Sequence, residues 1–155
     1  MLISKQGERD QVTRYLCVEF EKVLPLHGFG IETMPEKNIF DYIDNDPLVR
    51  VTLINPISNK KVNGYAYLDT GSDAIVVPRD LWLKLGLKML YRSNVSAVGG
   101  VVTTWYTRIS LEFLEDKHKN VIAFYQDDGD ILIGRNILDK YSITFDGKNS
   151  KLLIQ

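Results

Sequence analysis

From residue 48 onward, apolar residues alternate with polar ones in short runs that turn-forming residues separate. In the first run, Val49, Val51 and Leu53 alternate with polar residues, and the Asn- and Pro-containing cluster 55–61 ends it. A period of two places alternate side chains on opposite faces of a strand. Alternation or short β-rich runs predict further strands at 62–68, 94–98, 101–107, 109–113 and 121–125. This pattern predicts an all-β domain.

Helical spacing occurs in one segment near the N-terminus. Apolar residues recur at intervals of three and four along 11–27, with charged residues between them: Val12, Leu16, Phe20, Val23 and Leu24. We expect an amphipathic helix there that packs on the domain or on a partner, with Asp10 capping its start and Gly28 its end.

Turn-forming residues set the remaining boundaries. Between 28 and 46 the pattern is mixed and rich in Pro, Asn and Asp, so we expect turns and one short strand there. We therefore divide the chain into an extension, 1–46, and a domain, 47–155. The pair Gly99-Gly100 stands between two β-forming runs and predicts a tight hairpin turn, because such turns need positive φ at their central residues.

Composition limits the function without choosing one. The chain has 155 residues, 45% of them hydrophobic, which is enough for one compact domain with a real core. The net charge of −1 gives no electrostatic basis for binding nucleic acid or an anionic membrane surface. The single cysteine, Cys17, excludes an internal disulfide, and no run has the length of a signal peptide core or a membrane span. We expect a soluble, cytoplasmic protein.

Few residues suggest a metal or cofactor. His27, His118 and Cys17 are scattered without the spacing of metal ligands, so we expect no metal and no cofactor. The basic run 117–119 is interpreted as a solvated turn. Trp82 and Trp105 are expected in the core or in the wall of a pocket.

The most informative feature is a carboxylate that an aliphatic stretch delivers into a tight turn, in the run Tyr67-Leu68-Asp69-Thr70-Gly71-Ser72. A second distinctive run follows about sixty residues later: Ile131-Leu132-Ile133-Gly134-Arg135-Asn136-Ile137-Leu138. The two motifs, in this order, resemble the active-site turn and the Gly-Arg-Asn segment of retropepsin-like (clan AA) aspartic proteases. The segment 142–154 looks more like the cellular members, including those of eukaryotic ubiquitin-shuttle proteins, than like viral ones. The resemblance covers roughly residues 48–155.

This resemblance implies a retropepsin-like fold with one or two short helices. The implied order is strand, Asp turn, strand at 73–78, helix at 79–87, glycine hairpin, strands, Gly-Arg-Asn within 131–138, helix and a final hairpin within 142–154. It also implies endopeptidase activity on extended polypeptides, in which two aspartates share one proton around a water molecule. Only Asp69 stands in such a turn, since the Asp-Gly sequences at 128–130 and 146–147 lack the threonine and the apolar strand. A homodimer would supply the second aspartate across a two-fold axis.

The other site residues take their expected roles from their motif positions. Thr70 would form a hydrogen bond to the partner's turn, Gly71 would allow the sharp turn, and Ser72 would donate a hydrogen bond to Asp69 and favour its ionised form. Asp73 and Arg135 fall where viral enzymes place an ion pair that braces the turn. A substrate-covering flap is expected to consist of Val98, Gly99, Gly100 and Val101.

Simpler interpretations stand beside these. The Asp69 turn is alternatively an ordinary β-turn, Gly99-Gly100 an ordinary hairpin, and Arg135 a solvated surface residue. For the whole chain, the alternative function is a dimeric peptide-binding module of the same fold that does not cut, because fold alone does not establish activity. A third possibility is that the N-terminal helix covers the cleft or the interface and keeps the subunit inactive.

Overall fold

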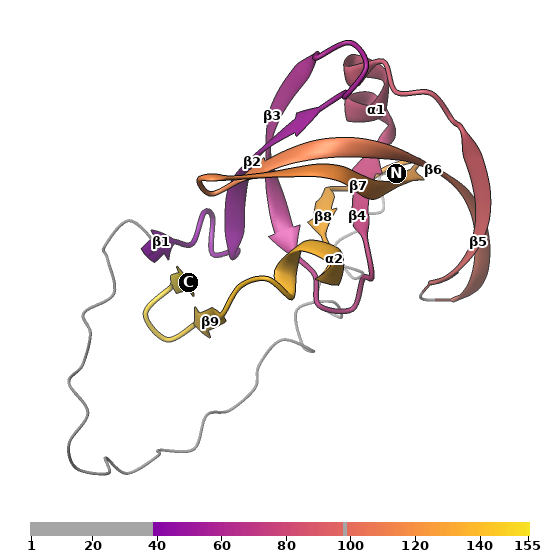
Figure 1. Cartoon of the computed structure of the whole chain (residues 1–155). Helices are drawn as coiled ribbons and strands as arrows, with labels where there is room; N and C mark the ends of the chain where they lie inside the picture. Colours follow the sequence, from indigo (N-terminus) through magenta and orange to yellow (C-terminus); the bar gives the residue numbers. More distant parts are fainter. Residues whose placement is uncertain (1–38, 98) are drawn as a thin grey trace, which may run out of the picture. The chain divides into compact units, whose positions relative to one another are not determined.

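The structure is a computed structural model and describes residues 39–97 and 99–155 (Figure 1). The described chain contains β1 (Ile39–Asp41), β2 (Leu48–Ile54), β3 (Lys61–Leu68), β4 (Ile75–Pro78), α1 (Arg79–Leu85), β5 (Tyr91–Ala97), β6 (Gly100–Phe113), β7 (Asp116–Gln126), β8 (Ile131–Ile133), α2 (Arg135–Leu138), β9 (Ile143–Asp146) and β10 (Lys151–Ile154). The predicted all-β class and the predicted order of elements are confirmed.

The period of two along the chain corresponds to two faces of the sheet. In β2, Val49, Val51 and Leu53 are buried, whereas Arg50 is exposed and Thr52 half-buried. Helix α1 begins directly after Pro78 and ends at Gly86, which adopts the left-handed conformation with φ of 67°. A glycine adopts this conformation without the steric cost of a Cβ, and its N–H donates a hydrogen bond to the last turn of the helix.

One sheet has seven strands in the order β2-β3-β8-β4-β7-β6-β5, and β2 also pairs with β6, which closes the sheet on itself. β8 lies between β3 and β4, parallel to β3 and antiparallel to β4 (Figure 1). The two strands that flank residues 69–74 are therefore not paired with each other. The chain must pass around the end of β8 to get from β3 to β4, and this passage is the Asp69 turn.

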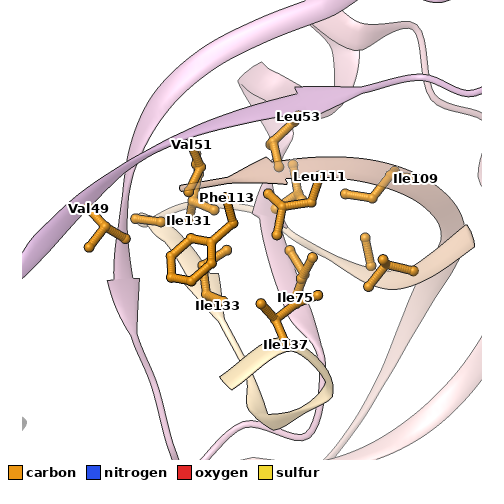
Figure 2. Packing of buried hydrophobic residues seen from close by; sticks show 14 of the residues in the cluster. Val49, Val51, Leu53, Ile75, Ile109, Leu111, Phe113, Ile131, Ile133 and Ile137 are labelled. Carbon is orange, nitrogen blue, oxygen red and sulfur yellow. The ribbon is translucent and has the colours of Figure 1, made fainter. Parts of the chain in front are cut away.

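The core fills the space that the closed sheet encloses, and Figure 2 shows its packing. Side chains from β2, β4, β6, β8 and α2 meet there: Val49, Val51, Leu53, Ile75, Ile109, Leu111, Phe113, Ile131, Ile133 and Ile137. A second sheet, β1-β10-β9, adds Leu152 and Ile154, which are fully buried, to the same cluster. Burial of these apolar side chains is the main stabilising term of the domain.

The predicted glycine hairpin exists, but its strands are longer and its turn is shifted. β6 is one continuous strand from Gly100 to Phe113 instead of two, and β5 begins at Tyr91 instead of residue 94. Gly100 pairs with Ala97 and so belongs to the ladder, although the sequence interpretation placed it in the turn. Aromatic packing of Tyr91 on Tyr106, with centroids 5.1 Å apart, accounts for the extension of the ladder beyond the predicted strand.

The interpretation of 117–119 as a solvated turn is wrong. These residues lie in β7, and the turn is at Leu114, whose φ is +56°. Lys117 extends toward Glu112 on β6, and His118 is half-buried and stands opposite Leu111. The apolar period is weak in this segment because polar residues of β7 stand opposite β6, with Lys117 facing Glu112 and His118 facing Leu111.

Some of the other predictions concern described residues and can be compared with the structure, whereas others concern residues that it does not describe. The short strand expected within 28–46 is confirmed as β1, and Asp44 and Asn45 form a turn with positive φ. Trp82 lies in the core as predicted. The helix at 11–27, its caps, Cys17, His27 and Val98 lie outside the described residues. No helix in the described part of the chain is long and apolar enough to cross a membrane.

Two leucines of α1 provide a test of the core. Leu85 is fully buried and Leu83 is 63% exposed on the same helix. We expect Leu85→Ala to lower the free energy of unfolding by about 2–5 kcal/mol, because it leaves a cavity. Leu83→Ala should change it by less than about 0.5 kcal/mol. Urea unfolding of the two variants measures both values, and equal losses would contradict the described orientation of α1.

Candidate functional site

The Asp69 turn begins where β3 ends against β8. Leu68, the last residue of β3, stands opposite Ile133, and the Asp69 N–H donates a hydrogen bond of 2.9 Å to the Ile133 carbonyl. Asp69 is thus fixed through its backbone to the strand that separates β3 from β4. The residue types of β3 and β8 explain this position, because both strands have buried apolar side chains that bring them into the core.

The Asp69 carboxylate is half-buried and held on one side. Its Oδ1 accepts a hydrogen bond of 2.9 Å from the Gly71 N–H, and its own backbone carbonyl accepts one of 3.2 Å from the Ser72 N–H. A Cβ on Gly71 would lie 3.2 Å from Oδ1, so glycine allows the carboxylate to approach closely. Within residues 39–97 and 99–155, Oδ2 has no hydrogen-bond partner. Thr70 and Gly71 are exposed beside it.

The prediction for Ser72 is wrong in this structure. Its hydroxyl donates a hydrogen bond of 2.8 Å to the Ala74 carbonyl and not to Asp69. A hydroxyl has a single hydrogen to donate, so the donor is used within the turn. The backbone N–H of Gly71 supplies the hydrogen bond that the sequence assigned to Ser72. Ser72 therefore shapes the turn and does not act directly on the carboxylate.

A second set of contacts joins the turn to the start of α2. The Arg135 N–H donates to the Ser72 carbonyl at 2.8 Å, and the Asn136 N–H donates to the Asp73 carbonyl at 3.1 Å. Arg135 Nη2 also donates to Asp73 Oδ1, so the structure brings the two residues of the expected ion pair together. The hydrogen bond from Arg135 to Asp73 raises the pKa of the guanidinium. Both side chains are largely exposed, so the pair orients more than it stabilises.

Gly134 is a site residue to which sequence reasoning gave no role. Its φ of −90° and ψ of −179° suit any residue, but there is no space for a side chain. A Cβ would lie 2.4 Å from the Ala74 carbonyl oxygen and 2.7 Å from the Ser72 carbonyl oxygen. The signal in the sequence was a glycine between an apolar strand and a helix, which can mark a close backbone approach.

The hairpin of β5 and β6 remains separate from the turn in the contacts described. Gly99 and Gly100 have φ of 101° and 131°, and Val101 is 72% exposed. Among the described residues, no hydrogen bond joins the end of this hairpin to the Asp69 turn. The β5–β6 hairpin that would contain the flap is therefore present. That it covers a substrate remains a prediction.

In the described part of the chain, the turn residues beside Asp69 are exposed. A hollow of about 820 Å³ lies over β1, β2 and β3, and Asp69 is not among the residues that line it. In the part of the chain that the structure describes, no group of three His, Cys, Asp or Glu side chains could hold a metal ion. The described residues thus form one oriented carboxylate, whose Oδ2 accepts no hydrogen bond from them, beside exposed turn residues.

Comparisons with known proteins found similarity to solved structures. No protein-family model matches the sequence, and no curated protein matches it. Among solved structures, the chain is similar to the EIAV protease in complex with the inhibitor HBY-793. The sequence identity is 21%, the match covers 74% of this chain and 93% of that chain, and the TM-score is 0.46.

The contact of Gly134 with the turn can be tested. We expect Gly134→Ala to lower the free energy of unfolding by about 1–3 kcal/mol, because the added methyl group forces the turn and α2 apart. Gly147→Ala is the matched control, since a Cβ there would have no atom within 4 Å. Urea unfolding and the backbone amide NMR shifts of residues 69–74 are the measurements. An unchanged spectrum and stability for Gly134→Ala would contradict the described contact.

Proposed function

We propose that this chain is an aspartic endopeptidase that hydrolyses peptide bonds of extended polypeptide segments, with Asp69 as its catalytic residue. The observation that carries the proposal is the Asp69 carboxylate, whose Oδ1 is held by the Gly71 N–H and whose Oδ2 has no hydrogen-bond partner among the described residues. A general base needs such an orientation, because its free oxygen must reach the proton that it removes. The ordinary β-turn interpretation does not explain why three strands and α2 support this turn.

The proposed reaction needs two carboxyl groups, and one chain supplies one of them. In the proposed reaction, an ionised Asp69 removes a proton from water while the water oxygen bonds to the peptide carbonyl carbon. A second, protonated aspartate gives its proton to the carbonyl oxygen. Collapse of this tetrahedral intermediate then breaks the C–N bond. Asp69 gives its proton to the leaving nitrogen, and the second aspartate takes a proton back from a hydroxyl group, which restores the pair. The pair must hold one proton between its two members, so activity should fall at both pH extremes, and the limits belong to the pair.

A second copy of the chain is the proposed source of the second aspartate. The sequence contains Asp-Thr-Gly once, beginning at Asp69. Thr70 and Gly71 beside Asp69 are exposed. In a two-fold dimer the same surface faces itself, so two Asp69 side chains can meet at the axis. Thr70 would then form its hydrogen bond across that axis. The Val98 to Val101 end of the β5–β6 hairpin would cover an extended peptide and pair with it as a strand does.

Replacement of the carboxylate by its neutral amide tests the assignment. We expect Asp69→Asn to abolish hydrolysis of a denatured protein substrate and to leave the fold intact, because an amide cannot remove the proton from water. Asp44→Asn is the control, since Asp44 is exposed in a turn with φ of 52°, a conformation that asparagine accepts. Peptide release over time and circular dichroism are the measurements. Full activity in folded Asp69→Asn protein excludes the assignment, and substrate binding without cleavage by the unaltered chain indicates the binding module.

Mixing of subunits tests the dimer. With a tenfold excess of Asp69→Asn chain, most unaltered subunits pair with an inactive one, so activity should fall about tenfold. An equal excess of Asp44→Asn chain should add activity instead. Dilution below the dimer dissociation constant should also lower the activity per subunit, as sedimentation at the same concentrations would show. Activity that stays proportional to unaltered chain in the Asp69→Asn mixture would contradict a shared site.

A further inference from the structure

A chain of hydrogen bonds connects the start of β7 to the segment between α2 and β9, away from Asp69. Tyr141 Oη donates to Asp116 Oδ2 at 2.7 Å, and His118 Nε2 lies 2.8 Å from Tyr141 Oη. On the other side of the ring, Lys140 Nζ lies 3.1 Å from His118 Nδ1. Four side chains from two distant segments are thus linked in series.

The order of donors fixes the protonation state of the imidazole. Tyr141 uses its hydrogen toward Asp116, so its oxygen can only accept from His118 Nε2–H. An ammonium group only donates, so Nδ1 must present its lone pair to Lys140. His118 is therefore neutral in this arrangement. A proton added to Nδ1 would place an N–H donor opposite the Lys140 N–H donor and would place the imidazolium charge beside the ammonium charge.

The surroundings of the ring favour the neutral form. Burial of the ring and then the Lys140 ammonium lower the pKa of His118 below its ordinary value of 6.5, and Asp116 opposes them with a smaller effect. On β6, the residue opposite His118 is the uncharged Leu111. The Tyr141 ring packs edge-on against Phe113 with centroids 5.0 Å apart, so the segment before β9 rests on the core at this point.

We propose that His118 is a protonation-sensitive latch, which accepts a hydrogen bond from Lys140 while neutral and releases Lys140 when the ring gains a proton. Residue 142 closes the C-terminal hairpin, because Ser142 and Gln155 exchange two backbone hydrogen bonds of 2.9 Å. Tyr141 keeps its contacts with Asp116 and Phe113 in both states. We therefore expect release of Lys140 to loosen this closure only locally, while Leu152 and Ile154 stay buried in the core. The latch is independent of the reaction at Asp69.

The sign of the pH effect follows from the neutral state. A pKa lowered by folding means that the latch stabilises the folded chain above pH 6.5, and the contribution is lost as the pH falls from 6.5 toward the folded-state pKa. We expect His118 in the full chain to titrate below 6.5 by NMR of the imidazole protons. Comparison with His118→Gln assigns its signal, because the chain has two histidines.

Variants of Lys140 separate the latch from simple burial. Lys140→Met should raise the pKa of His118, and Lys140→Arg should keep it near that of the unaltered chain. Lys88→Met is the matched control, because Lys88 is exposed and has no contact with this network. The proposal is overturned if His118 titrates at or above 6.5, or if Lys140→Met leaves the pKa of His118 unchanged.

Hydrogen exchange reports on the closure itself. Between pH 7 and 5.5, protection of the Ser142 and Gln155 amides relative to the Leu111 amide should fall several-fold in the unaltered chain. It should stay constant in His118→Gln, which keeps a donor toward Tyr141 and cannot gain a charge. Equal pH dependence in the two proteins would overturn the latch.

Discussion

The position of β8 between β3 and β4 is the constraint on which the candidate site depends. Because this strand occupies the place where β3 and β4 would otherwise pair, the chain must turn around its end, and Asp69 lies in that turn. Gly134 then brings the backbone that follows β8 to within hydrogen-bonding distance of Ser72 and Asp73. The turn is held mainly by backbone groups, so its shape depends on strand order more than on its own side chains.

The sequence predicted those features that depend on local pattern. The alternation in β2, the carboxylate after an apolar strand and the helix at 79–87 each follow from neighbouring residues, and the structure contains all three. Ser72 and His118 were misassigned because their partners, Ala74 oxygen in one case and Lys140 and Tyr141 in the other, depend on the bend of a turn and on tertiary contacts. The role of Gly134 was missed for the same reason, since its crowding involves residues about sixty positions earlier.

The β5–β6 hairpin is unequally supported along its length. At its base, Tyr91 stacks on Tyr106, Tyr106 packs on Phe124, and Arg92 lies over the Trp105 ring at 5.3 Å. Near the glycines, Val101 and Val102 are exposed and the ladder hydrogen bonds remain. Side-chain packing therefore holds the base to the sheet, whereas the end can move without loss of buried apolar contacts.

The parallel pairing of β3 with β8 also has a consequence for the order in which the protein forms. The Asp69 N–H bonds to a carbonyl at position 133, so residues 64 positions apart must meet before the turn is fixed. Contacts between residues so far apart form slowly, because the loop between them must first lose its conformational freedom. During synthesis from the N-terminus, the Asp69 segment is made well before β8 and the first turn of α2. A nascent chain therefore carries this aspartate unsupported until about 67 further residues have been added, up to residue 136.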